Sequence, residues 1–405
     1  MKPYYRSSRK WFNILFLCCW GSKTILRLPI LLIGKLPIIG SYNENIFNIF
    51  IFILVILALK EFRYFRGKDL FIIFLMILSV LVSLLKGGNL YFSENIMALI
   101  FSVFPFYFIG RHFDIHDKLL IKGNKYLMEQ LIYIFSFLGI VYMFFMQWYS
   151  LRTGSYNSIF ENSSAATYSK LLLGYCCFYL FKNKKIHSFF IVIFGFIAMV
   201  SYGNRASLLA TLIMFFLASI FYIDLRKRKT LLLLFCEMLC IVLIIVNFSA
   251  LVQFVGNILS IWGFNVRIID MFGASGNLTG DNGRLPLYEN AKYFIERSPI
   301  GGYGLYSDRV LLGDYVHNVF LEFLLDFGPI VGIILSVCLI ILIVIGIKNH
   351  IKDKDFLGFL IVLIASEMIM LMVSGSYLQE GFFFMLIGMC LSDKKINYTS
   401  KYIGK

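Results

Sequence analysis

The sequence predicts an all-α integral membrane protein that forms one polytopic domain over residues 1–405. Of the 405 residues, 59% are hydrophobic and only 15% are charged, a composition far outside that of soluble globular domains. Many apolar runs are long enough to cross about 30 Å of hydrocarbon as helices. The alternating pattern of a membrane barrel is absent from the sequence, and backbone groups in lipid must then be paired within helices.

The apolar runs predict about twelve membrane-spanning helices. Lys23 and Arg27 interrupt the first of them. The tenth run, 317–347, is too long for one crossing, so we expect Gly328 and Pro329 to divide it into a short entrance helix and the true crossing. The predicted spans are 11–35, 44–60, 69–86, 92–110, 127–149, 164–181, 187–203, 205–223, 230–254, 317–347, 356–376 and 378–392.

The basic residues predict the orientation of the chain. A net charge of +15 would suggest nucleic-acid binding in a soluble protein, but here most Lys and Arg residues fall in alternate connecting segments. This is the positive-inside pattern, with both termini in the cytoplasm and no nucleic-acid partner. The N-terminal segment resembles a signal peptide without a cleavage site, so we expect an uncleaved first helix. All eight cysteines fall in apolar spans, which argues against a disulfide framework.

Two long segments face the outside in this arrangement, at about 150–163 and 255–316. A connection of about sixty residues in an otherwise tight bundle is usually functional. We therefore expect the candidate site in the 255–316 loop, immediately before the tenth span.

His317 is the only histidine on the predicted outer side. It lies beside Asn318 where the long loop meets an apolar helix, and a helix N-terminus favours an anionic group. Imidazole can accept a proton near neutral pH. His112 and His116 have the i, i+4 spacing of a metal pair, but we interpret them as part of a solvated cytoplasmic loop and expect no metal site.

Arg205 lies between two apolar spans that are joined by almost no loop. An arginine at membrane depth is costly and should face a polar cavity or a partner, although its side chain could also reach the headgroups. Guanidinium groups bind phosphates in a bidentate way, so the outer arginines predict a metal-free diphosphate site. Glu237 and Glu367 lie within apolar spans and leave open a transport pathway.

Three stretches resemble the O-antigen polymerase and O-antigen ligase superfamily. In the large outer loop and the following helix, the pattern is an Arg, an amphipathic stretch, Pro-x-x-Gly-x-Gly, a gap, His-Asn and Gly-x-x-Gly. The segment SYGNRAS, with Arg205, is similar to a second motif. The segment RTGSYNS, with Arg152, is similar to the family's other outer loop. The loop pattern is carried here by Arg284, Pro299, Gly302, Gly304, His317, Asn318, Gly328 and Gly332.

The resemblance implies a metal-independent glycosyltransferase of the membrane-embedded GT-C type in the bacterial cytoplasmic membrane, with no cofactor. Its donor would be an undecaprenyl-diphosphate-linked oligosaccharide, and the active site would face outward. His317 would act as the base or orient the acceptor, while Arg284 and Arg205 would neutralise the departing diphosphate. Further substrate contacts are expected from Arg152, Asn318, Tyr288, Glu322, Gly302 and Gly304.

The resemblance does not separate a polymerase of O-antigen or capsule repeat units from a ligase that transfers the glycan to another acceptor. We favour the polymerase because of the chain's richness in Phe, Ile and Lys. Membrane lipid is an expected partner, and a chain-length regulator is a further partner that this function would allow. The non-enzyme alternative is a flippase or exporter of the same glycans. Such a protein should line a central path with charges at several depths in the membrane, whereas here the polar candidates cluster at the outer ends of the spans.

Overall fold

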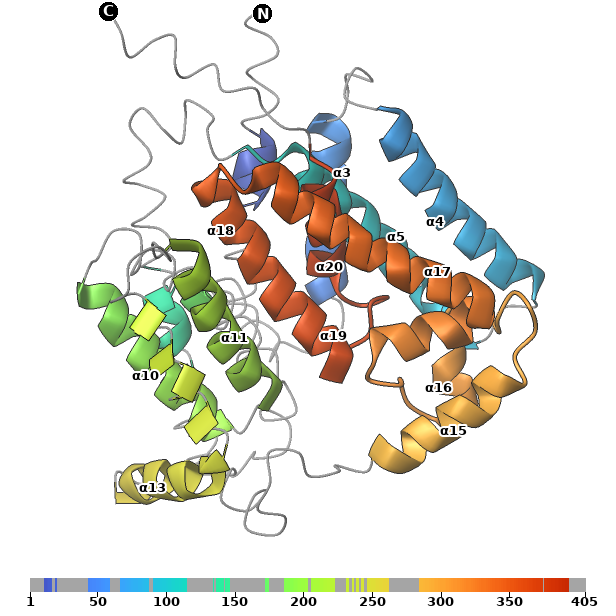
Figure 1. Cartoon of the computed structure of the whole chain (residues 1–405). Helices are drawn as coiled ribbons and strands as arrows, with labels where there is room; N and C mark the ends of the chain where they lie inside the picture. Colours follow the sequence, from blue (N-terminus) through green and yellow to red (C-terminus); the bar gives the residue numbers. More distant parts are fainter. Residues whose placement is uncertain are drawn as a thin grey trace, which may run out of the picture.

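The computed structural model describes residues 11–16, 43–58, 66–86, 90–114, 186–202, 205–222, 284–373 and 375–392, with shorter stretches within 134–145, 172–174 and 231–261 and the single residue 19. Every regular element in these ranges is a helix (Figure 1). The predicted all-α class is therefore confirmed for the described part of the chain.

The N-terminal half contributes α3 (Asn43–Ala58), α4 (Gly67–Leu85), α5 (Leu90–His112), α10 (Ile186–Tyr202) and α11 (Arg205–Tyr222). The C-terminal half contributes α13 (Phe248–Ile261), α15 (Arg284–Glu296), α16 (Ser307–Leu312), α17 (Val319–His350) and α18 (Lys354–Leu363). The last elements are the π-helical turn η2 (Ile364–Met368), α19 (Ile369–Val373) and α20 (Gly381–Cys390).

Three helical segments of the described residues are long and apolar enough to cross a membrane: α4, α17 and the continuous run Lys354–Met372. The bent pair that makes up α5 adds a fourth if it is counted as one span. The predicted spans at 11–35, 127–149 and 164–181 lie largely outside the described residues. The total of twelve therefore stays a prediction.

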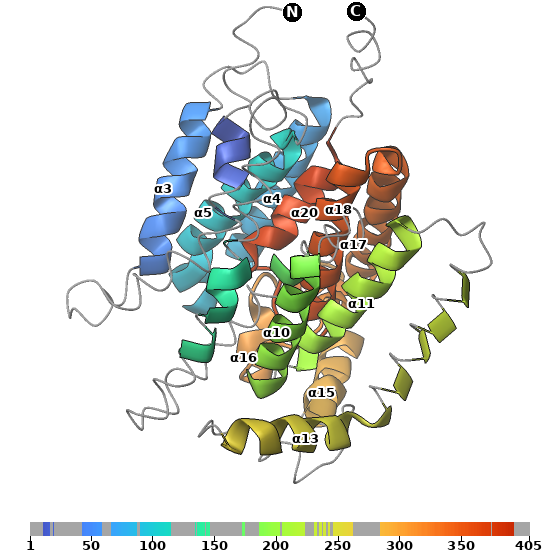
Figure 2. The ribbon, with the colours of Figure 1, turned by 90° about the vertical axis from the view of Figure 1, so that its left-hand side faces the viewer.

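Helix α20 lies in the interior of the bundle, against α5 (Figure 2). Two glycines bring their backbones together: a Cβ on Gly110 would lie 2.1 Å from the carbonyl oxygen of Met385, and one on Gly388 would lie 2.2 Å from that of Tyr107. Small residues at such positions let membrane helices approach closely. By contrast, α4 and the part of α17 from Ile330 onward leave most of their apolar side chains exposed.

One end of the bundle gathers basic residues. Arg111 forms a buried ion pair with Asp69 at 2.8 Å, and Lys68 donates to the carbonyl of Leu391 at 2.7 Å. Helix α17 finishes at this end, where the His350 ring lies 3.0 Å from the Ser392 hydroxyl. The opposite end holds the last residues of α4, the first residues of α17, and α15 and α16.

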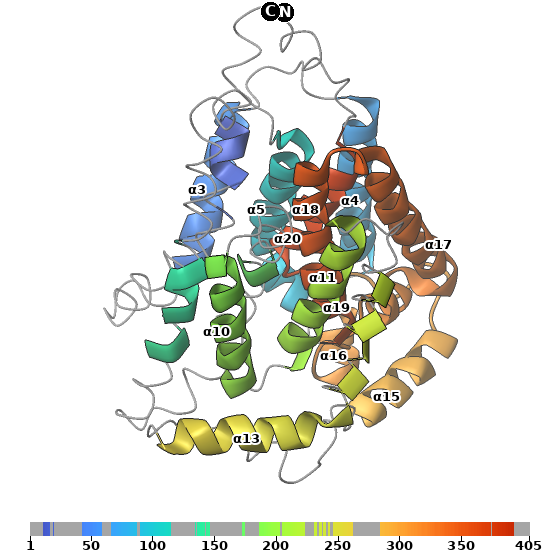
Figure 3. The same cartoon turned by 60° about the vertical axis from the view of Figure 1, so that its left-hand side comes forward.

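Helix α13 differs from the predicted ninth span at 230–254. It runs from Phe248 to Ile261 and lies across the foot of the bundle in the views of Figures 1 and 3. Phe254, Ile258 and Ile261 are exposed on it at i, i+4 and i+7 spacing. The predicted loop at 255–316 therefore begins with helix, and it also contains α15 and α16.

Candidate active site

The site is built on a break in α17. Gly328 has φ 80° and ψ 166°, so the helix is interrupted there, immediately before Pro329. The expectation that these two residues divide the long apolar segment is confirmed. Because proline has no N–H, the carbonyl of Leu325 loses its helical donor.

The backbone of the preceding loop supplies the missing donors. The N–H of Tyr303 donates to the carbonyl of Leu325 at 2.8 Å, and the N–H of Gly304 donates to that of Asp326 at 2.9 Å. The Pro-x-x-Gly-x-Gly segment therefore caps the broken helix.

Glycines make this contact possible. Gly302 has φ +71°, and a Cβ there would lie 2.3 Å from the carbonyl oxygen of Asp326. A Cβ on Gly332 would lie 2.7 Å from the carbonyl oxygen of Phe323, although nine positions along a straight helix would separate them by about 13 Å. Helix α17 therefore bends sharply. The close approach that Gly302 and Gly304 permit is an approach to protein; their expected role toward substrate stays a prediction.

The end of α4 supports the same loop. The Ser83 hydroxyl accepts from the N–H of Leu305 at 2.9 Å and donates to the carbonyl of Ser79 at 2.9 Å. The Lys86 ammonium donates to the carbonyls of Gly301 and Gly302. The loop is thus held from two helices that are far apart in the sequence.

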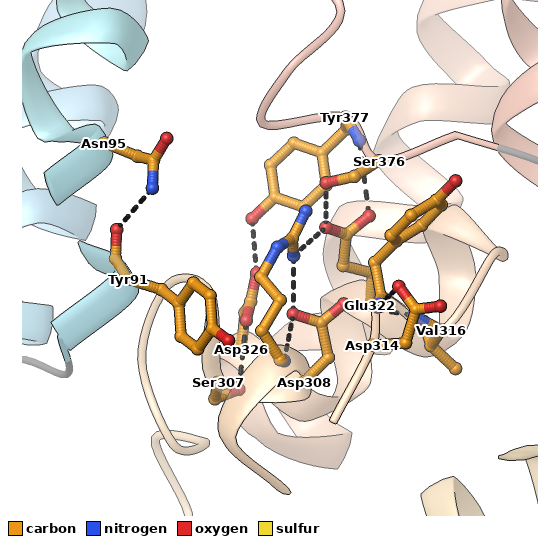
Figure 4. Close-up of polar contacts among 12 residues, drawn as sticks. Tyr91, Asn95, Ser307, Asp308, Asp314, Val316, Glu322, Asp326, Ser376 and Tyr377 are labelled. Atoms are coloured by element: carbon orange, nitrogen blue, oxygen red, sulfur yellow. Dashed lines mark hydrogen bonds and ion pairs between the residues drawn. The ribbon is translucent and has the colours of Figure 1, made fainter. Parts of the chain in front are cut away.

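A buried polar network lies beside the break (Figure 4). Arg309 Nη1 lies 2.6 Å from Asp308 Oδ1 and 3.5 Å from Glu322 Oε1. Arg309 is only 8% exposed, and its Nη2 has no hydrogen-bond partner within the described structure. Burial and the neighbouring carboxylates act in opposite directions, and the net effect raises the pKa of Arg309.

The segment before α20 completes this network. Glu322 accepts from the Ser376 hydroxyl and from the N–H of Tyr377 at 3.2 Å. Asp326 accepts from the Tyr377 hydroxyl at 2.8 Å and from the Ser307 hydroxyl at 3.1 Å. Both carboxylates are almost wholly buried, and they tie α16, α17 and the segment before α20 together.

His317 lies in the turn between α16 and α17. Its backbone has φ 57°, a left-handed conformation that is unusual for a residue other than glycine. The ring lies 4.0 Å from that of Tyr315, Nε2 lies 3.9 Å from Asp314 Oδ2, and Nδ1 has no hydrogen-bond partner in the described part of the chain. Burial, followed by the positive charge of Arg284, lowers the pKa of His317.

Arg284 begins α15, and its positive charge is one of the causes that lower the pKa of His317. Helix α15 is held by a small apolar cluster centred on Ala291, Val316 and Leu325, against which Tyr288 packs. Two residues that are thirty-three positions apart in the sequence are therefore brought to one end of the bundle.

Of the other predicted site residues, two have partners within the protein and two cannot be placed in the site. Asn318 is the N-cap of α17, and its side-chain oxygen accepts from the N–H groups of Phe320 and Leu321 at 3.0 and 3.3 Å. Glu322 lies inside the buried network, with protein partners on both carboxylate oxygens. Arg205 begins α11, but its side chain lies outside the description. Arg152 is outside the described residues altogether.

Six members of the buried network were not predicted from the sequence. Asp326 could have been recognised, because it follows Glu322 at i+4 on one face of an otherwise apolar helix. The others lie in the short helix α16 within the long loop and at the end of another apolar run, where the sequence pattern does not single them out. The six residues are Ser307, Asp308, Arg309, Asp326, Ser376 and Tyr377.

Residues 190–337 match the family model described as O-antigen ligase. The matched region contains α10, α11, α15, α16, the break in α17, and the residues Arg205, Arg284 and His317. No curated protein and no solved structure gives a significant match. Together with the apolar helices, which fit a membrane protein, this match confirms the resemblance to the O-antigen polymerase and ligase superfamily over residues 190–337, less than half of the chain.

Proposed function

We propose that this protein is a polysaccharide polymerase of the O-antigen or capsule type, which joins undecaprenyl-diphosphate-linked repeat units on the outer face of the cytoplasmic membrane. One observation carries the proposal. Arg284 at the start of α15 and His317 in the turn before α17 lie at the end of the bundle that is opposite the basic residues Lys68 and Arg111. By the positive-inside rule, this end faces outward.

In the proposed reaction, an acceptor sugar hydroxyl attacks the anomeric carbon of the donor glycan. The new glycosidic C–O bond forms as the bond to the diphosphate breaks, and undecaprenyl diphosphate leaves with the bonding electrons. His317 takes the hydroxyl proton or orients the hydroxyl. Its lowered pKa keeps the imidazole neutral at pH 7, as a base requires.

The leaving diphosphate carries the negative charge that develops in this reaction. Arg284, whose positive charge acts on His317, is proposed to stabilise it, and Arg205 is proposed for the same role. Guanidinium groups supply this stabilisation without a metal ion or a cofactor. Groups fixed before the reaction need no reorganisation during it, which suits a loop that is capped onto α17.

The remaining predicted contact residues are proposed to have different roles. Tyr288 and the amide nitrogen of Asn318 are available on the substrate side, and Arg152 is proposed for the acceptor's path. We now assign Glu322 to positioning, since its carboxylate is fully engaged within the protein. Gly302 and Gly304 support the loop that carries these groups.

A ligase is the second candidate, because the matching family model is described as O-antigen ligase. The two functions differ in the acceptor. The test uses purified protein and the lipid-linked repeat units that accumulate in a strain without the gene. A polymerase lengthens these units when no other acceptor is added. A ligase leaves them unchanged until lipid A core is supplied, and this result would replace the proposed function.

A further inference from the structure

We propose that Asp308 is the positioning residue of His317: it holds the turn that carries the imidazole, and it has no contact with the substrate. This inference rests on the proposed function, because it assigns a purpose to the geometry around the proposed base. It concerns a residue in the gap between the Pro-x-x-Gly-x-Gly and His-Asn elements, which the sequence comparison leaves without a role.

The first observation is the set of hydrogen bonds that Asp308 accepts. Its side chain is fully buried. Oδ2 accepts from the N–H of Val316 at 3.1 Å, one residue before His317. Oδ1 accepts from the N–H of Arg309 at 3.0 Å and from Arg309 Nη1 at 2.6 Å. One carboxylate therefore ties the turn before His317 to the helix α16.

The second observation is that the turn is held from its other side by the same ion pair. Arg309 Nη1 also reaches Glu322 Oε1 at 3.5 Å, and Glu322 lies in the first turn of α17. The ion pairs among Asp308, Arg309 and Glu322 thus join the two ends of the segment 310–321, which contains His317. In Figure 4, Asp308, Glu322 and Val316 lie together at this turn.

The third observation is that His317 needs external support. A left-handed backbone at a residue with a side chain is strained and persists only where the surroundings fix it. Among the described residues, none forms a hydrogen bond with the imidazole Nδ1, and Asp314 Oδ2 lies 3.9 Å from Nε2. The position of the ring therefore depends on the backbone turn and on contact with the Tyr315 ring.

Asp308→Asn tests the inference. Asparagine keeps the shape, but its one side-chain oxygen cannot accept from both Val316 and Arg309 with the strength of a carboxylate. We expect kcat per folded enzyme to fall roughly 10- to 100-fold. The KM for the lipid-linked repeat units should stay within about twofold, because a positioned base acts in the transition state.

The decisive measurement is a double-mutant cycle that combines Asp308→Asn with His317→Ala. The rate of each variant is measured from the lengthening of radiolabelled glycan. If Asp308 acts through His317, Asp308→Asn has little further effect once His317 is removed. The matched control is Asp69→Asn. It disrupts another fully buried Asp–Arg pair, at the opposite end of the bundle, and its effect should be the same in both backgrounds.

Equal losses from Asp308→Asn in both backgrounds would overturn the inference, as would an unchanged kcat per folded enzyme in the single variant. Failure of the proposed function gives a different result. In that case the wild-type protein itself would not lengthen the lipid-linked repeat units, whereas the inference alone fails when the wild type is active and the two losses are equal.

Discussion

His317, the proposed base, is positioned without a hydrogen-bonded partner at Nδ1 in the described structure. Its ring is mostly buried and touches Tyr315, and its Nδ1 is unbonded in the described structure. Most histidine bases are oriented by a group bonded to the second ring nitrogen. Here the orientation comes from the backbone, so the chemistry of the ring is set mainly by burial and by nearby charges.

The pH dependence of the reaction should report these charges. Burial and then Arg284 lower the pKa of His317, whereas Asp314 and Asp308 raise it and Arg309 lowers it. Since a base works in its neutral form, we expect the acidic limb of the kcat/KM profile below about pH 6.5. Asp314→Asn removes a charge that stabilises the imidazolium, so the limb should move to lower pH.

Arg284→Gln should move the same limb in the opposite direction, to higher pH, because it removes a charge that opposes protonation. Profiles measured on purified protein with lipid-linked repeat units would check both shifts. Identical limbs in the wild type and both variants would mean that another group titrates.

Arg284 itself is expected to bind the diphosphate. A charge-assisted hydrogen bond contributes about 1.5–3 kcal/mol, which corresponds to roughly 10- to 150-fold in rate or affinity. Arg284→Lys keeps the charge but loses the bidentate geometry, so it should remain clearly impaired. The measurement is the glycan ladder in cells that lack the native gene. The exposed Lys292, about two turns further along α15, offers the control: Lys292→Ala should give a normal ladder.

At the scale of an element, the break in α17 joins two motifs that are separate in the sequence. The carbonyls of Leu325 and Asp326, freed by Gly328 and Pro329, are the acceptors for Tyr303 and Gly304. The loop glycines and the helix glycines therefore serve one contact. A side chain at Gly302 or at Gly328 must displace backbone atoms, which are much harder to move than a flexible side chain.

Glycine replacements can separate the cost of backbone strain from the cost of steric overlap with neighbouring atoms. Gly313→Ala, with φ +77° and nothing within 4 Å of the new Cβ, introduces only strain, at a cost of about 1–3 kcal/mol. Gly328→Ala, with φ +80°, adds a contact of 2.6 Å with the carbonyl oxygen of Ile300. We expect a clearly larger fall in Tm for Gly328→Ala, measured on detergent-solubilised protein. Equal falls would contradict the described packing.

The sequence predicted this element well and its surroundings poorly. Apolar length, together with Gly328 and Pro329, was enough to predict a broken helix, because backbone geometry at these residues is local. Helix α13 begins inside the predicted ninth span at 230–254 and continues beyond it to Ile261, because apolar content alone does not mark where a helix ends. The network of Asp308, Arg309 and Tyr377 depends on contacts between distant segments, which a single sequence does not specify.

At the scale of the whole molecule, the two ends of the bundle differ in charge and in construction. One end holds Arg111 with Asp69, and Lys68 on the carbonyl of Leu391. The other holds α15, α16 and the polar network. This arrangement agrees with a protein whose basic end stays in the cytoplasm while its site faces outward.

Cysteine labelling can test the orientation. In a cysteine-free background, Ile300→Cys should react with a membrane-impermeant maleimide added to intact cells, because Ile300 is 80% exposed near the site. Lys352→Cys, in the exposed turn after α17, should react only after permeabilisation. The reverse pattern would place the site in the cytoplasm and remove the basis of the proposed function.

The capping of α17 by the loop also has a consequence for how the protein moves during turnover. If the segment 299–304 lifted like a lid, two carbonyls of the buried residues Leu325 and Asp326 would lose their donors, at a cost of about 1–3 kcal/mol each. Substrate exchange should therefore occur around a loop that stays closed. In hydrogen–deuterium exchange, the amides of Tyr303 and Gly304 should remain protected with and without lipid-linked glycan, while the exposed residues Gly313 and Asp314 exchange rapidly.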